Sequence, residues 1–339
     1  MKRFLIRHLG NMGDMVFFIP PVLATLKKHY PGCHITFVTV WGFKDKKGQW
    51  GKRDQGGFSI HLIMTNPHLD QLVHYHDTKL SLDGKICRED GQSFPTWNKK
   101  YYDQQKNSGR YDQVFELDFG LKVDDNPIQR MYETIGLPNE TLTDYKIYFT
   151  DRDLAAAQAV IDDAPRPRIV LLEGLASTTT RGWDPGKIPA LEQAIKEVYQ
   201  VDPIWFGGNY IPDYQGRSLS LRENIATLSY CDAGIGVMSG PIHFAAAADL
   251  PTLTLYCDHP IHRAAPAYFL GKKHRTLLGP STRPYQLLKN EQPAIALTPA
   301  EISRQQFKSW NQPGRQTTKT CLSVITVDEI MLVLKEMLS

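Results

Sequence analysis

The chain has 339 residues, and at roughly 100 to 200 residues per domain this length predicts two domains. Lys and Arg total 39 against 36 Asp and Glu, a net charge of +3, which lacks the basic excess of a dedicated nucleic-acid-binding protein. Apolar residues make up 42% and charged residues 22%, as in ordinary globular proteins, so the composition excludes a disordered or fibrous chain.

The cysteines and the apolar stretches indicate where the protein resides. The five cysteines are scattered and odd in number, without a Cys-x-x-Cys pair, which disfavours a disulfide framework and a cysteine zinc site and fits a reducing cytoplasm. The longest apolar stretch, residues 15–26, contains two prolines and is shorter than the ~20 residues of a membrane-spanning helix. Arg7 interrupts the first apolar run, so no secretory signal is expected.

The N-terminal half opens with a strand, a helix and a second strand, which predicts a parallel sheet. Residues 4–6 predict a buried strand, a helix follows the glycine-containing turn at 9–14 and ends at Pro31-Gly32, and residues 34–40 predict the second strand. Residues 41–110 are polar and without a clear period, so we expect part of this insertion to form loops that face a substrate. Further elements of this half are expected at 59–64 (strand), 111–117 (strand) and 127–136 (helix).

The C-terminal half repeats the alternation of strands and helices. A helix begins at Asp151, and a proline-containing stretch at 162–168 leads to a fresh strand. Strands are expected at 169–172, 203–206, 233–237 and 252–256, and helices at 187–199, 221–231, 242–248 and 327–338. The sequence therefore predicts two α/β domains, with a boundary between residues 150 and 168.

Each half contains one strand-to-helix turn where a ligand could bind. In parallel sheets ligands gather at the carboxyl ends of strands, where helix N-termini expose unpaired N–H groups that favour phosphate. In the second half Ser239 can cap the helix, Gly240 lets a ligand approach the backbone, and Pro241 lacks an N–H where none is needed. His243 lies in the first helical turn. The same residues also fit an ordinary turn with a surface histidine.

The turn of the first half brings backbone close to a substrate through four residues, Gly10, Asn11, Met12 and Gly13. Asp14 follows them and could act as a general base at the cleft. The competing interpretation makes Asp14 a first-turn acid that only complements the helix dipole. A dinucleotide fingerprint is disfavoured, because a third glycine is missing and no acid ends the strand at Val40 to hold a ribose.

A third segment offers groups that suit a diphosphate. Thr179, Thr180 and Arg181 follow the strand at 169–172, with Trp183 close behind, and such a loop either clamps a diphosphate or is a polar surface loop. A Walker A motif is absent. The histidine pairs at 74/76 and 259/262 lack a third spaced ligand, so we expect no metal site, and Cys257 is expected to be a small core residue.

Taken together, these segments resemble glycosyltransferase family 9, the heptosyltransferase family of lipopolysaccharide core assembly. The likeness is carried in order and spacing across almost the whole chain. It consists of Arg7 to Asp14 with Pro20 and residues 26–31, of residues 180–183, and of residues 239–247 followed by Pro251 and Tyr256.

The resemblance implies a GT-B architecture, with two Rossmann-like parallel-sheet domains facing a cleft. It implies an acceptor-binding domain at 1–160, a nucleotide-sugar-binding domain at 161–325, and a final helix at 326–339 that packs back on the N-terminal domain. It also implies inverting transfer of a heptose or another hexose-like sugar to a glycan or glycolipid acceptor, without a metal or other cofactor. The localisation it implies is cytoplasmic, with peripheral association at the inner membrane face as a further option, and no nucleic-acid partner is expected.

The family's mechanism maps onto these positions. Asp14 would take the proton from an acceptor hydroxyl as that oxygen attacks the anomeric carbon. The leaving diphosphate would be met by the N–H groups at Ser239, Gly240 and Ile242 and by Arg181, and one such donor can be worth roughly 3 kcal/mol.

The resemblance departs from the family at Met238, where the family usually carries an Asp that contacts the donor sugar. A thioether cannot accept a strong hydrogen bond from a sugar hydroxyl, so the sequence does not determine which sugar the donor carries. The departure also motivates an alternative, a catalytically degenerate GT-B protein that binds a nucleotide or glycan without chemistry. An oxidoreductase or epimerase on the same type of sheet is disfavoured by the missing ribose acid.

Overall fold

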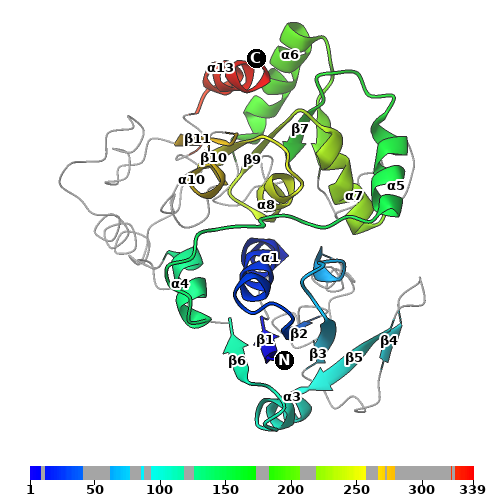
Figure 1. Ribbon diagram of the computed structural model, residues 1–339. Coiled ribbons are helices and arrows are strands. Elements are labelled where there is room, and N and C mark those ends of the chain that lie inside the picture. Colours follow the sequence, from blue (N-terminus) through cyan, green and yellow to red (C-terminus); the bar gives the residue numbers. More distant parts are fainter. Residues whose placement is uncertain are drawn as a thin grey trace, which may run out of the picture. The chain divides into compact units, whose positions relative to one another are not determined.

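The computed structural model of the chain forms two compact units, which are described one at a time (Figure 1). Unit 1 comprises Met1–Gly120 and Ile128–Thr150, and unit 2 comprises Leu121–Pro127 and Asp151–Ser339. The residues that the structure describes are 1–8, 12–40, 62–76, 85–87, 93–117, 126–172, 183–206, 219–256, 266–271, 273–278, 322 and 325–339.

Unit 1 is built on a six-stranded sheet with the order β4-β5-β3-β2-β1-β6. All neighbouring strands are parallel except the pair β4 and β5. The strands are β1 (Arg3–Arg7), β2 (His34–Val40), β3 (Gln71–His76), β4 (Lys85–Cys87), β5 (Ser93–Asn98) and β6 (Gln113–Glu116). The helices are α1 (Met12–His29), α3 (Lys99–Lys106) and α4 (Pro127–Thr134). The predicted β1-α1-β2 motif is confirmed.

Helix α1 connects two neighbouring strands at the centre of this sheet. Its residues 15 to 23 are almost wholly buried, and Phe4 of β1 packs on Tyr30 beyond the helix end, with ring centroids 5.2 Å apart. Three basic residues in its last turn complement the helix dipole, and Gly32 then takes a φ of +76° that ends the helix. The chain therefore enters α1 at the carboxyl end of β1.

Parts of the polar segment 41–110 form regular elements, because β3, β4 and β5 belong to the sheet. The expectation that another part of the segment forms substrate-facing loops stays a prediction, since residues 41–61, 77–84 and 88–92 lie outside the described residues. Strands β3 and β5 pair with each other in parallel, and α3 covers them by burying Tyr102 against Tyr75 and Trp97. The strand expected at 59–64 is wrong where it is described, because Leu62 and Ile63 are helical.

Unit 2 carries a five-stranded parallel sheet with the order β11-β10-β9-β7-β8. The strands are β7 (Ile169–Leu172), β8 (Ile204–Phe206), β9 (Ala233–Val237), β10 (Thr252–Tyr256) and β11 (Arg275–Leu278). The helices are α5 (Asp151–Ile161), α6 (Ile188–Tyr199), α7 (Leu221–Thr227), α8 (Gly240–Ala247), α10 (Pro266–Leu270) and α13 (Val327–Leu338), with 3-10 turns at Pro185–Lys187 and Leu228–Tyr230. The expected two parallel-sheet α/β domains are thus confirmed.

One face of this sheet is covered by α6 and α13, which lie side by side in Figure 1. Ile330 and Leu334 of α13, four residues apart on one helical face, are fully buried in the core of unit 2. One face of α13 thus belongs to the core of unit 2. The expectation that residues 326–339 also pack back on the N-terminal domain stays a prediction.

The opposite face is covered by α5, α7 and α8. Helix α5 begins immediately after unit 1 and is fixed to α7 by an ion pair between Asp153 and Arg222, whose side chains are 12% and 4% exposed. The boundary drawn from sequence at residue 160 falls at the end of α5, whereas its contacts place α5 in unit 2.

Candidate functional site

The turn between β9 and α8 has the geometry expected of an anion site. Strand β9 is buried throughout, Met238 and Ser239 are partly exposed, and the helix begins at Gly240. Ser239 has extended backbone, with φ −156° and ψ 174°. The first turn of a helix leaves its N–H groups without intrahelical acceptors, here those of Ser239, Gly240 and Ile242, since Pro241 has none.

The expectation that Ser239 caps the helix is wrong. Its side chain makes no cap hydrogen bond, and its hydroxyl donates backwards to the carbonyl of Val237 at 3.2 Å. The chain does cap other helices: Ser220 and Glu223 form a reciprocal capping box on α7, and Thr326 starts one on α13. The N-cap residue of α8 thus supplies no side-chain acceptor to the first-turn N–H groups, unlike those of these two helices.

His243 is buried rather than on the surface, at 7% exposure. Burial lowers its pKa from 6.5 to about 4, so the imidazole is neutral at physiological pH. His243 is therefore a buried, uncharged residue in the first turn of α8.

The segment that follows β7 is described only from Trp183 onward. Thr179, Thr180 and Arg181 lie outside the described residues. Trp183 is 1% exposed and donates its indole N–H to the carbonyl of Ile325 at 3.0 Å, so it is a core residue that fixes the approach to α13.

The turn of unit 1 is described in part. Gly10 and Asn11 lie outside the described residues, and so do the side chains of Met12 and Asp14. The backbone of Met12, Gly13 and Asp14 forms the first turn of α1, which follows the carboxyl end of β1, a strand that lies between β2 and β6. Both interpretations of Asp14, general base and first-turn acid, are compatible with this position.

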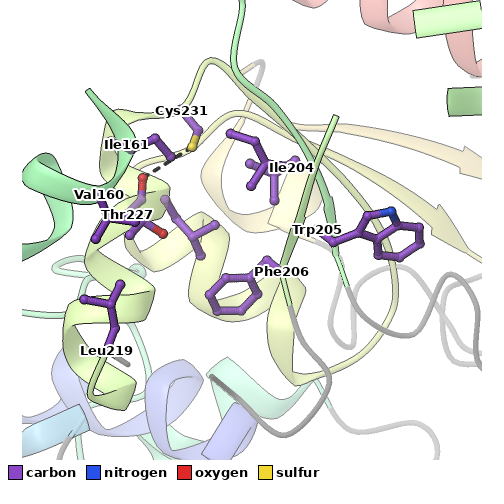
Figure 2. A pocket seen from close by; sticks show the side chains of 10 residues that line it. Val160, Ile161, Ile204, Trp205, Phe206, Leu219, Thr227 and Cys231 are labelled. Carbon is purple, nitrogen blue, oxygen red and sulfur yellow. Dashed lines mark hydrogen bonds between the residues drawn. The ribbon is translucent and has the colours of Figure 1, made fainter. Parts of the chain in front are cut away.

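The described part of the chain also contains a small cavity, whose lining includes no residue of either turn (Figure 2). It lies in unit 2 among α5, α7 and β8, where its walls include Ile161, Ile204 and Phe206. Its reachable space of about 10 Å³ is barely room for one water molecule. Burial raises the pKa of the Cys231 thiol beside it to about 12, so this cysteine is not a nucleophile. We interpret the cavity as a packing defect.

Two properties of the described residues bear on metals and membranes. No group of three or more His, Cys, Asp or Glu side chains that could hold a metal ion occurs within the described ranges. The histidine pair at 259/262 and Cys257 lie outside those ranges. No described helix is long and apolar enough to cross a membrane.

One family model and several solved structures are similar to this chain. The model of "Glycosyltransferase family 9 (heptosyltransferase)" matches residues 217–295, which include β9 and α8. No curated protein matches the sequence.

Solved structures match over the whole chain. A glycosyl transferase family 9 protein from Veillonella parvula has a TM-score of 0.60 at 15% identity, over 99% of this chain and 97% of that one. The ADP-heptose heptosyltransferase II of E. coli has a TM-score of 0.56 at 13% identity, with 100% and 98% covered. The E. coli heptosyltransferase WaaC with ADP has a TM-score of 0.53 at 13% identity, with 99% of both chains covered. The family model thus matches one part of the C-terminal half, and the solved structures show that the whole chain shares the two-domain GT-B fold of these glycosyltransferases.

Proposed function

We propose that this protein is a glycosyltransferase that moves a sugar from a nucleoside-diphosphate donor, bound by unit 2, to a hydroxyl acceptor bound by unit 1. The observation that carries the proposal is the uncapped start of α8 at the carboxyl end of β9. Three N–H groups there are aimed along the helix axis, where the dipole favours a diphosphate. The family model matches this same segment.

The chemistry follows from where charge develops. As the anomeric bond breaks, the diphosphate gains negative charge, which the N–H groups of Ser239, Gly240 and Ile242 stabilise together with the guanidinium of Arg181. His243 is neutral without a ligand, and we propose Arg181 as the cation for the diphosphate. Asp14 removes the acceptor proton and the anomeric centre is inverted, with Thr179, Thr180 and Met238 completing the donor site.

Related structures suggest which donor to test first. WaaC was solved with ADP and with ADP-2-deoxy-2-fluoro heptose, and the dodecameric heptosyltransferase TibC with ADP-D-beta-D-heptose. We therefore propose ADP-heptose as the first donor and a glycan or glycolipid as acceptor. TibC is described as iron-containing, so our proposal that transfer needs no metal calls for assays with EDTA and with added iron.

The proposed diphosphate site is tested by placing a carboxylate at the start of α8. Ser239→Asp supplies a carboxylate that caps the first-turn N–H groups and repels a phosphate. We expect this variant to melt at a higher temperature than the parent and to lose the upward melting shift that ADP gives the parent. Thr326→Asp is the matched control, because it adds the same charge at the start of α13, on the other face of the sheet. An unchanged ADP shift in Ser239→Asp would remove α8 from the donor site.

The catalytic half is tested separately at Asp14. Asp14→Asn should abolish sugar transfer while ADP affinity stays within about twofold, because the base contributes to bond formation rather than to nucleotide binding. Normal turnover in this variant would show that Asp14 is the first-turn acid of the competing interpretation.

Met238 supports a second candidate, a degenerate protein that binds nucleotide sugars without chemistry. The two candidates differ in whether ADP is released from ADP-heptose in the presence of acceptors. Tight donor binding without release, from a panel of ADP-, UDP- and GDP-sugars, would favour the binding protein.

A further inference from the structure

Two glycines on one face of β9 make room for the α8 layer. Gly234 and Gly236 are two residues apart, so both face the same side of the sheet. A Cβ added to Gly236 would lie 3.0 Å from Cβ and Cδ1 of Leu172 and 3.3 Å from Cδ1 of Ile242. Glycine weakens a strand interior, and neither of these glycines needs a positive φ, so close packing is what their presence indicates.

The side chains next to the two glycines lie at opposite ends of α8. The neighbour of Gly236 is Ile242, whose own N–H belongs to the open first turn of α8. A Cβ at Gly234 would instead lie 2.9 Å from Cδ2 of Leu250, beyond the last residue of the helix. Leu250 is tied there by its N–H to the carbonyl of Ala245 at 3.0 Å.

We propose that Gly236 is a positioning residue for the donor diphosphate: it lets Ile242 seat the first turn of α8 against β7 and β9, and so sets where the N–H donors stand. The inference rests on the proposed function and adds a specific residue to it. Ile242 is fully buried, so an added methyl group 3.3 Å from its Cδ1 would disturb its packing. The added group would also lie 3.0 Å from Leu172 on the neighbouring strand β7. The strain is then shared between β7 and, through Ile242, the first turn of α8.

A small movement of these donors is enough to weaken binding. Hydrogen bonds to an anion lose strength steeply when the donor moves off line, and a misplacement of 1 Å can cost about 100-fold in an active site. A shift of a few tenths of an ångström should therefore weaken ADP binding by roughly three- to tenfold.

Titration calorimetry with ADP on the full chain tests this, at a temperature well below every melting point. Gly236→Ala should bind ADP about three- to tenfold more weakly than the parent, whereas Gly234→Ala, with a similar steric load on the same strand, should bind like the parent. Gly236→Ala/Ile242→Val lacks the Cδ1 atom through which the new methyl group presses on α8 but keeps the contact with Leu172, so part of the affinity should return. A merely structural role would lower melting temperatures without this pattern in ADP affinity.

The outcomes separate the inference from the function beneath it. Equal ADP affinity in the parent and both alanine variants, equal weakening in both, or no recovery in the double variant would overturn the role of Gly236 and leave the proposed function standing. A parent that binds none of ADP, UDP or GDP would overturn both. If Gly236→Ala does not fold, Ile242→Ala and Leu250→Ala ask the same question by removing contacts, and only the first should weaken ADP binding.

Discussion

Ser220 and Ser239 stand at the starts of α7 and α8, and their replacement by alanine should lower the free energy of unfolding by unequal amounts. At Ser220 the side chain accepts the N–H of Glu223 at 3.3 Å, and the Glu223 carboxylate accepts the N–H of Ser220 at 2.8 Å. Ser220→Ala removes half of this box and should cost about 1 kcal/mol. At Ser239 the substitution removes one hydroxyl bond to the carbonyl of Val237 in a partly exposed residue, where water can replace it, so we expect less than about 0.5 kcal/mol.

Thermal unfolding without ligand measures the difference. For a domain of about 150 to 250 residues a loss of 1 kcal/mol lowers the melting temperature by about 2 to 4 °C, so Ser220→Ala should fall by that amount and Ser239→Ala by less than half of it. Two equal decreases would mean that the Ser239 hydroxyl caps α8 in solution. The start of α8 would then not be reserved for a ligand, and the argument for the donor site would fail.

Three further predictions concern the stability of unit 2. Arg222→Met should cost about 3 to 5 kcal/mol in urea unfolding, because it strands the carboxylate of Asp153, and Arg222→Met/Asp153→Leu should regain most of that loss; an equal loss in both would refute the buried pair. Burial lowers the pKa values of both His243 and His274 to about 4, so the unfolded chain binds more protons between pH 6.5 and 4 and stability should fall on acidification through this range, with a smaller slope in His243→Gln. Trp183→Phe should lower the melting temperature by a few degrees, because the carbonyl of Ile325 loses its indole donor and a fully buried side chain becomes smaller; no change would show that the remaining donor, Lys187 Nζ at 3.1 Å, is sufficient.

The elements that were predictable from sequence are those whose signals are local. Strand β7 is an unbroken run of four apolar residues, and α1 ends one turn before Gly32, whose positive φ only glycine adopts easily. Each such signal sits within a few neighbouring residues, so no knowledge of the partner elements was needed.

The layer on β3 and β5 was missed because its signals are weak. Only Tyr102 and Gln105 are buried in α3, so the helix has no apolar stripe to detect. Pro95 interrupts β5, which argues against a central strand. The structure accommodates it because the parallel ladder with β3 begins after it, at the pair of His74 and Thr96.

The sequence analysis also missed two details of the turn between β9 and α8, although one of them had a signal in the sequence. Whether Ser239 caps its helix depends on the rotamer of one hydroxyl, which no pattern reveals. The burial of His243 could have been inferred, because the residues around it in α8 are apolar on all sides and such helices are buried. The spacing of Gly234 and Gly236 within a strand is likewise a known sign of close backbone approach.

In the proposed function, the turn between β9 and α8 contacts the diphosphate through its backbone N–H groups. Its side chains are withdrawn from the helix start, since the Ser239 hydroxyl faces back to Val237, Pro241 has no donor, and His243 is buried and neutral. Substitutions that shorten these side chains should change ADP affinity little, whereas substitutions that move the helix, above all at Gly236, should change it more. The opposite order of sensitivities would mean that side chains bind the diphosphate and that the position of α8 is incidental.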